Sequence, residues 1–330
     1  MIFFCLYYSG VEWVLARMLP AKAVAILMYH GVCDCAPIPA HINFHLSRNL
    51  FEQQMRALKR RYRVLPLTDV VDSVTRGKPL KKAVVLTFDD GYKNNACYAA
   101  PIVNRFGLPF SVFVATAYVD DECWMPLNKL YWMWAEGELS WEEMTSQREQ
   151  LRNRPAAEVP KIFALERERP KTISVDAAES FAMLSWDEIR EMADNGAEFG
   201  SHTHSHCNMA IEGEVQQRQE LQLSKEMLEK HLGSPVRLFA YPYGALSEVA
   251  RANVVQAGYE CALSTEYGLV TSHTDRFAMP RLGHQRTIWM FTGELLYQFC
   301  KQAGKDWWAG LVGHSVPEGA LGKQTKEHHG

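Results

Sequence analysis

The sequence predicts an α/β fold built around a parallel sheet or barrel. Short apolar runs alternate with helix-like segments along most of the 330 residues, and this alternation is typical of βαβ units. Polar motifs directly follow four of the apolar runs, which is expected where functional side chains gather at the carboxyl ends of parallel strands. Residues 118–182 break the alternation and are predicted to be a Trp-rich helical insertion.

The N-terminal segment, residues 1–22, is predicted to form an amphipathic helix. Its first residues are apolar, but they lack a basic region, and Glu12 and Arg17 follow closely. The segment is therefore too short for a membrane span and is a poor signal peptide. Such a helix can cover the open end of a core, which is the commoner role, or lie on a membrane surface. We expect a cytoplasmic protein, with this segment as the candidate for peripheral contact with the inner membrane.

Three longer strands are predicted before the insertion, with helices between them. In chain order the elements are a strand at 23–29, a helix at 47–61, a short strand at 64–65, a helix at 69–73, a strand at 83–86, a helix at 94–106 and a strand at 110–115. The first of these helices is identified by Ser47, a good capping residue, and by Phe51, Met55 and Leu58 at helical spacing. Gly107 ends the last one.

Four tryptophans mark the insertion: Trp124, Trp132, Trp134 and Trp141. Aromatic faces suit pyranose rings, so a sugar-stacking role is one interpretation. Tryptophans that fill a small helical subcore are the commoner case.

The regular alternation returns after the insertion. The elements are a helix at 185–196, a strand at 197–201, a helix at 214–232, a strand at 237–241, a helix at 247–258 and a strand at 260–264. Ser185 and Glu188 form a capping box at the start of the first helix, and Gly233 ends the longest one. The strand at 260–264 is the last clear one.

The composition indicates an ordinary globular protein without a nucleic-acid partner. Hydrophobic residues make up 47% and charged residues 22%, and the formal net charge is -3, whereas nucleic-acid-binding proteins carry a basic surplus. The eight cysteines show no CxxC pair. This scatter argues against a disulfide framework or a structural zinc site and favours reduced thiols.

Two adjacent carboxylates, Asp89 and Asp90, end the predicted strand that begins at residue 83. Side chains of neighbouring residues in an extended chain point in opposite directions, so one could bind a metal while the other accepts a substrate proton. The alternative is a solvated Asp-Gly turn without a function.

Three histidines, His202, His204 and His206, lie within five residues after the strand at 197–201. Two histidines and one carboxylate can hold a divalent transition metal and leave positions open for water and substrate. In a strand all three histidines would share a face, whereas in a helical turn only the outer two would. The spacing therefore leaves the binding pair open, and a surface cluster without a function is the alternative.

Three motifs in order resemble the polysaccharide deacetylase family of carbohydrate esterases, of the family 4 type. They are Thr-Phe-Asp-Asp-Gly at 87–91, Gly-Ser-His-Thr-His-Ser-His at 200–206 and Phe-Ala-Tyr-Pro-Tyr-Gly at 239–244. The resemblance implies a distorted (β/α) barrel with fewer than eight regular units, a catalytic domain at 23–290, and a C-terminal helix and tail at 291–330. It also implies a single divalent metal, with zinc as the first choice and cobalt or nickel as alternatives.

Carried over by the resemblance, Asp90, His202 and His206 look like the metal ligands. Asp89 looks like the general base that takes a proton from the attacking water. The backbone N–H of Tyr243 resembles the family's oxyanion donor.

Two family features are displaced in this sequence. Many members place an arginine that orients the catalytic aspartate where this chain has Ala240. Arg281 resembles the arginine that members of the Tyr-Pro-Tyr-Gly subgroup carry downstream, and pairing with a surface acid is its alternative role. The late Leu-x-Leu-His motif, which supplies the general acid, has no clean match. His284 and His30 are the candidates, and each could equally be a structural histidine.

The resemblance implies metal-dependent hydrolysis of an N-acetyl group from an amino sugar in a polysaccharide or glycan precursor. A lipid- or nucleotide-linked precursor would fit the cytoplasmic setting expected above. One alternative is a deformylase that acts on a lipid-linked amino sugar. Another is a non-catalytic glycan-binding or scaffold protein that retains the fold.

Overall fold

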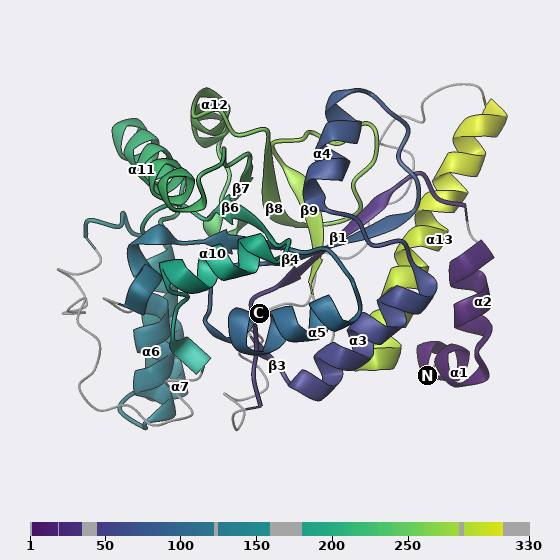
Figure 1. Ribbon diagram of the computed structural model, residues 1–330, viewed down its shortest axis with the longest axis horizontal. Helices are drawn as coiled ribbons and strands as arrows, with labels where there is room; N and C mark the ends of the chain where they lie inside the picture. Colours follow the sequence, from purple (N-terminus) through teal and green to yellow (C-terminus); the bar gives the residue numbers. More distant parts are fainter. Residues whose placement is uncertain are drawn as a thin grey trace.

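The computed structural model describes residues 2–18, 20–34, 45–121, 125–158, 180–283 and 287–312 (Figure 1). At its centre seven parallel strands close into a barrel, in which the last strand pairs with the first. In barrel order they are β1 (Val24–Tyr29), β4 (Ala83–Phe88), β5 (Ser111–Val114), β6 (Glu198–Ser201), β7 (Leu238–Ala240), β8 (Cys261–Tyr267) and β9 (Met279–Gly283). The expected barrel with fewer than eight units is confirmed.

Helices surround the barrel, and most begin and end where the sequence predicts (Figure 1). Their bounds are α1 (Ile2–Ser9), α2 (Val11–Met18), α3 (Arg48–Arg61), α4 (Leu67–Thr75), α5 (Ala100–Arg105), α6 (Pro126–Ala135), α7 (Trp141–Arg152), α10 (Trp186–Asp194), α11 (Glu214–Leu232), α12 (Glu248–Gln256) and α13 (Ile288–Val312). Ser47 caps α3 by accepting from the Leu50 N–H, and Ser185 forms the expected capping box with Glu188. These caps satisfy backbone donors that a helix leaves unpaired.

Short elements complete the described chain. The pair β2 (Gly31–Val32) and β3 (His45–Leu46) forms a separate two-stranded sheet. A π-helical turn, η1 (Asn95–Ala99), leads into α5, while η2 (Thr116–Asp121) and η3 (Pro242–Gly244) are 3-10 turns that follow strands β5 and β7.

Alternate residues of each strand fill the barrel interior, as the pleat of a strand requires. Ile26, Val85, Phe113 and Leu263 belong to one buried cluster, which also receives apolar side chains from α4. The intervening strand residues pack outward against the helices. Because side chains alternate along β4, Thr87 and Asp89 point to the same inward side as Val85.

Three described strands, β2, β3 and β9, were not predicted from the sequence, and one predicted strand is shorter than expected. Strand β9 follows the strand predicted at 260–264. Its sequence, Met-Pro-Arg-Leu-Gly, is not an apolar run and therefore does not predict a strand. It nevertheless pairs with both β8 and β1 and closes the barrel. The short strand expected at 64–65 is reduced to a single bridge between Val64 and Val84.

The insertion forms a small helical core of its own from α6 and α7. Its buried side chains are mainly leucine, methionine and tyrosine, including Leu130, Tyr131 and Met144. Trp134 is only partly buried against this core and meets Trp141 edge to face, at 5.8 Å between ring centroids. The expected helical subcore is therefore present, but tryptophans lie at its margin rather than fill it. Trp124 lies outside the described residues.

Two N-terminal helices stand in place of the single one expected. Helices α1 and α2 pack beside α13, and α2 also touches α3 (Figure 1). Within the part of the chain that the structure describes, no helix is both long and apolar enough to cross a membrane.

The barrel interior supplies a test of the fold. Phe113 is fully buried there, so we expect Phe113→Ala to lower the free energy of unfolding by about 3–5 kcal/mol through lost burial and a residual cavity. Urea denaturation followed by circular dichroism measures the change. The exposed Val215 on α11 provides a control, since Val215→Ala should shift stability by less than about 0.5 kcal/mol. A similar small effect at Phe113 would contradict its interior position.

Candidate active site

The candidate site lies where several barrel strands end on the same side. Asp89 and Asp90 follow β4, His202 follows β6, and Tyr243 lies in the turn after β7. Because all the strands run parallel, their carboxyl ends meet at one rim. Residues that are far apart in the sequence are thereby brought together.

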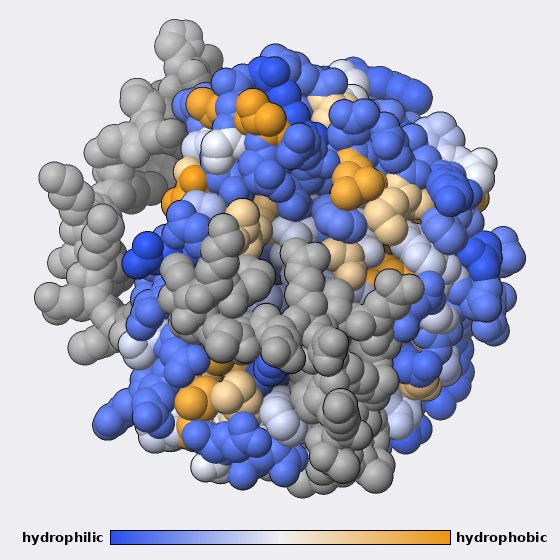
Figure 2. Space-filling view, turned by 90° about the vertical axis from the view of Figure 1, so that its left-hand side faces the viewer, coloured by the Kyte–Doolittle hydropathy of each residue, from blue (hydrophilic) through white to orange (hydrophobic). Residues whose placement is uncertain are grey.

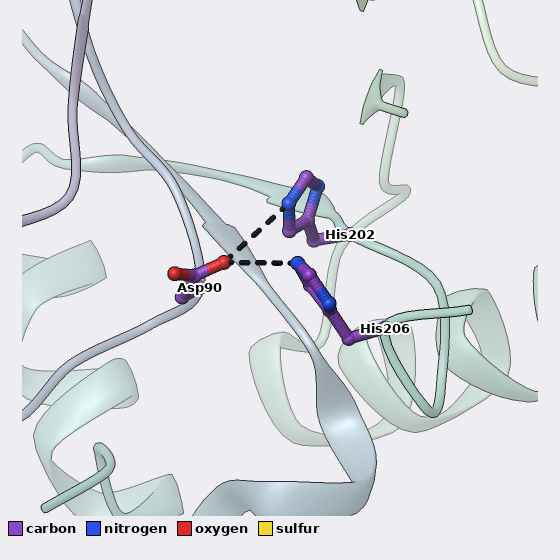
Figure 3. Close-up of side chains that lie close together, drawn as sticks. All are labelled: Asp90, His202 and His206. Atoms are coloured by element: carbon purple, nitrogen blue, oxygen red, sulfur yellow. Dashed lines mark ion pairs between the residues drawn. The ribbon is translucent and has the colours of Figure 1, made fainter. Parts of the chain in front are cut away.

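Asp90, His202 and His206 form a tight buried cluster (Figure 3). The Nε2 atoms of His202 and His206 lie 3.5 Å and 3.3 Å from Oδ1 of Asp90. One ligand atom from each residue lies within 4.8 Å of the others. These are the three residues that the family resemblance assigns to a metal. His204 instead places Nδ1 2.9 Å from the Thr116 hydroxyl, so the outer two histidines form the pair.

The cluster fits a divalent cation. Oδ1 of Asp90 is buried and receives no hydrogen bond of ordinary geometry within the described residues, although two imidazole nitrogens face it. A buried carboxylate oxygen without a donor is costly unless a cation or proton compensates it. One carboxylate and two imidazoles are a common donor set for zinc and similar metals, with positions left open.

The tautomer of His202 is set by its second nitrogen. Nδ1 lies 2.8 Å from the Ala240 carbonyl oxygen, which can only accept, so Nδ1–H donates and Nε2 keeps its lone pair toward the cluster. Burial lowers the pKa of His202 to about 4. The ring is therefore neutral near pH 7, as a metal ligand must be.

Asp89 is held by Arg281 through two parallel hydrogen bonds. Nη1 donates to Oδ1 at 2.8 Å and Nη2 donates to Oδ2 at 2.7 Å, with both side chains buried. Arg281 also donates from Nε to the Ser264 carbonyl oxygen. Burial raises the pKa of Asp89, but Arg281 and nearby imidazoles outweigh it, so the pKa lies below its usual value. Asp89 is thus ionised, and Arg281 does not pair with a surface acid.

The backbone around the cluster is strained. Asp90, Thr203, His206 and Tyr243 all have positive φ angles, of 74°, 63°, 55° and 59°. Non-glycine residues in this region cost of order 1–3 kcal/mol each, and such residues concentrate at functional sites. Here the turns aim Asp90 and the histidines at one point instead of letting the strands continue.

Glu220 on α11 holds the histidine loop, and the sequence patterns missed it. Its carboxylate accepts the backbone N–H groups of His204 and Ser205, at 2.9 Å and 2.7 Å, as well as the Ser205 hydroxyl. Glu220 is buried in the middle of a helix. The sequence does contain an indication of this role. Glu220 lies on the same helical face as Leu221, Ser224 and Leu228, and an acid on a buried face needs a polar partner.

The insertion contributes a wall beside the cluster. Tyr243 meets His206 edge to face at 4.7 Å between ring centroids, and the Arg152 guanidinium of α7 lies 5.7 Å from the Tyr243 ring. Tyr92 donates to the Asn128 side chain of α6 at 2.7 Å. Burial raises the pKa of Tyr131 on α6 to about 12. Burial also raises the pKa of Tyr92 and of Tyr243. All three phenols therefore stay protonated near pH 7.

Of the two candidates for the general acid, His30 lies among the described residues and His284 does not. His30 directly follows β1. It lies near both carboxylates, because its charge is among the causes that lower the pKa of Asp89 and of Asp90. The structure therefore brings His30 to the rim.

Comparisons with known proteins show the family and the fold of the chain. A family model described as polysaccharide deacetylase matches residues 76–262. The poly-β-1,6-N-acetyl-D-glucosamine N-deacetylase of Staphylococcus aureus is 22% identical over 250 residues, which cover 73% of this chain and 68% of that protein.

Two solved structures have the same fold. The deacetylase PplD of Streptococcus pyogenes, in complex with acetate, superimposes with a TM-score of 0.61 at 20% identity, covering 84% of this chain and 99% of that one. IcaB of Ammonifex degensii gives a TM-score of 0.57 at 18% identity, covering 83% and 97%. Since the family model spans more than half of the sequence, the chain belongs to the polysaccharide deacetylase family, hydrolases that act on carbon–nitrogen bonds.

Proposed function

We propose that this protein is a metal-dependent hydrolase that removes an N-acetyl group from an amino sugar in a glycan or glycan precursor. The carrying observation is the buried cluster of Asp90, His202 and His206 beside a separately held, ionised Asp89. The relatives named above, one an N-deacetylase of a poly-amino-sugar and one solved with acetate, support an acetyl group on an amino sugar.

The residues of the chain divide the reaction between them. Asp90, His202 and His206 would hold the cation, which when bound polarises the acetyl carbonyl and acidifies a water molecule. Asp89 takes the proton from the attacking water. The Tyr243 backbone N–H stabilises the developing oxyanion, a contribution typically worth about 3 kcal/mol.

The pairing with Arg281 leaves Asp89 able to act as a base. Each carboxylate oxygen has two lone pairs, and the parallel hydrogen bonds use one on each oxygen. The remaining lone pairs can accept a proton from water. The guanidinium fixes the orientation of the carboxylate and keeps it ionised in a buried place.

We also place the chain in the Tyr-Pro-Tyr-Gly subgroup. Support comes from Arg281, which reaches Asp89 from β9. Ala240 occupies the position where other members carry the orienting arginine, and here its carbonyl instead fixes the tautomer of His202. The role of the missing arginine is thus filled from another strand.

A precursor substrate with an anionic group is favoured by the charge of the insertion wall. Arg152 lies over Tyr243, and the charge of Arg148, one helical turn earlier, acts on Tyr131. Neither arginine has a carboxylate within ion-pair distance in the described part of α7 and its surroundings. Unpaired guanidinium groups beside a site suit phosphate or carboxylate groups. We therefore favour a phosphate-bearing, lipid- or nucleotide-linked amino sugar over a neutral polymer.

The histidine pair provides a matched test of metal binding. We expect His206→Ala to lose bound metal and to lower acetate release by about 100-fold or more, since a direct ligand should matter at least as much as residues that only support ligands. His204→Ala should change both by less than about threefold, because its ring contacts Thr116 instead. Metal content by mass spectrometry and acetate release from N-acetylglucosamine oligomers are the measurements. Equal losses in the two variants would remove the assignment.

The two aspartates can be separated in the same assays. We expect Asp89→Asn to lower turnover by about 100- to 10,000-fold while metal content stays at the wild-type level, because a general base is lost but no ligand. Asp90→Asn should lose the metal as well. Arg281→Lys keeps the charge but not the paired geometry, so we expect an intermediate loss of turnover with metal retained. Near-normal turnover of Asp89→Asn would exclude Asp89 as the base.

The substrate preference can be tested at the insertion wall. We expect Arg152→Gln to raise KM for a nucleotide-linked N-acetylglucosamine by about tenfold and to leave KM for neutral oligomers unchanged. Arg154→Gln is the control, since Arg154 lies two residues further on and faces Glu158. A wild-type enzyme that turns over neutral oligomers and ignores the nucleotide-linked sugar would refute the anionic precursor while leaving the deacetylase function intact.

A further inference from the structure

We propose that the outer surface of α1 and α2 docks the protein on an anionic membrane. We call this surface the N-terminal apolar face. It consists of exposed large apolar side chains within fifteen residues of sequence: Phe4, Tyr8, Val11, Val14, Leu15 and Met18. Tyr8 is 67% exposed and Met18 is 74% exposed. This inference goes beyond the proposed reaction and does not depend on it.

The apolar side chains of α2 share one side of that helix. Positions 11, 14, 15 and 18 recur at the spacing of a single helical face. Ala16, on the other side, is 2% exposed, and its carbonyl accepts a hydrogen bond from the Lys82 side chain. Helix α2 therefore covers the core with one side and presents the other to the surroundings. Packing against the core, the commoner of the two roles considered for the segment, is present, and the other side of the helix is free to contact a surface.

The N-terminal helices are held firmly enough to present this face. Helix α1 packs along α13, where Phe4 meets Trp289 at 6.1 Å between ring centroids. Phe4 also contacts Tyr8 at 4.5 Å. Met290 and Tyr297 on α13 are exposed as well, but at helical spacing they share a face with Glu294, which accepts a hydrogen bond from the Tyr267 hydroxyl. The N-terminal apolar face is therefore defined by residues of α1 and α2.

Two basic side chains contact the helices that carry the N-terminal apolar face: Arg61 contacts α1, and Lys82 donates to the Ala16 carbonyl oxygen of α2. The Arg61 guanidinium lies 5.8 Å from the Tyr7 ring of α1. Arg60 and Arg63, close to it in sequence, are exposed, as is Lys81, which precedes Lys82 and strand β4. Arg60, Arg63 and Lys81 have no carboxylate within ion-pair distance among the residues described. In a chain of net charge -3, these exposed basic residues are close in sequence to Arg61 or Lys82, the two that contact α1 and α2.

The opposite side of the molecule shows no apolar group of this extent among its described residues. Figure 2 views the molecule from the left of Figure 1, away from α1 and α2, and its described surface is mainly hydrophilic with apolar residues in small separate groups. Scattered apolar residues are normal on a protein surface, whereas a contiguous group on adjacent helices marks an interaction site.

Charge complementarity selects an anionic bilayer over a second copy of the chain. In a symmetric dimer through this face, the same basic residues would meet across the interface and repel one another. Anionic lipid headgroups attract them, and the acyl region accepts the apolar side chains. We expect such a helix pair to lie parallel to the membrane surface, with its apolar side chains at the boundary between the headgroups and the acyl chains.

Flotation of the full chain with vesicles tests this proposal. We expect binding to vesicles of phosphatidylcholine mixed with phosphatidylglycerol, weaker binding to phosphatidylcholine alone, and loss of the difference at high salt. The double variant Tyr8→Ser/Met18→Ser should reduce binding about tenfold or more, because both side chains point away from the core. A matched control is Val215→Ser on α11, which is 71% exposed and should bind like the wild type.

A second variant separates the two contributions. Arg60→Gln/Lys81→Gln should weaken binding to the mixed vesicles and leave binding to phosphatidylcholine alone unchanged, with Lys230→Gln on α11 as its control. Thermal melting of each variant checks that the fold is retained. Failure of the wild type to float with either vesicle would overturn the proposal. So would a stable dimer in sedimentation that Met18→Ser dissociates, since this would assign the face to a second copy.

Discussion

The buried pair of Asp89 and Arg281 is the interaction on which the rest of the site depends. A carboxylate inside a barrel is tolerated only with a well-oriented counter-charge, and removing one partner would leave the other charged in a poorly solvating place. Arg281 can reach Asp89 because β9 closes the barrel against β1 and continues the inward face begun by Met279. Because Arg281 compensates the charge of the ionised Asp89, Asp90 can turn toward the histidines without two unpaired carboxylates lying side by side.

Strain in the rim is offset by contacts from outside the barrel. The left-handed backbone at Thr203 and His206 redirects the chain after β6, and two backbone N–H groups of that loop bond to the Glu220 carboxylate. Thr203 also accepts the Cys207 N–H through its hydroxyl. A surrounding structure that over-determines such turns is what lets them persist. The position of the histidines is therefore a property of α11 as much as of the loop.

The sequence predicted the parts of the molecule that local chemistry specifies. Caps such as Ser185 and apolar strand runs carry their signal within a few residues, and the Asp-Asp and histidine motifs were visible in the same way. Strand β9 escaped because a proline and a buried arginine replace its apolar pattern, so tertiary pairing decides its structure. The spacing of the three histidines left the metal-binding pair open, and the family resemblance assigned His202 and His206. The physical reason is tertiary, since His204 contacts Thr116, which lies 88 residues away.

The residues of the candidate active site and the residues of the insertion belong to different parts of the fold. The carboxylates, histidines and Arg281 all come from barrel strands or the turns directly after them, whereas the insertion has its own apolar core and meets the barrel through side chains such as Tyr92 and Tyr243. A subcore of this kind can change its outer residues without disturbing the packing that aligns Asp89. The N-terminal helices lie on a different part of the barrel, next to α13. The proposed substrate preference and the proposed membrane docking therefore rest on different parts of the molecule, and neither part contributes the carboxylates, the histidines or Arg281.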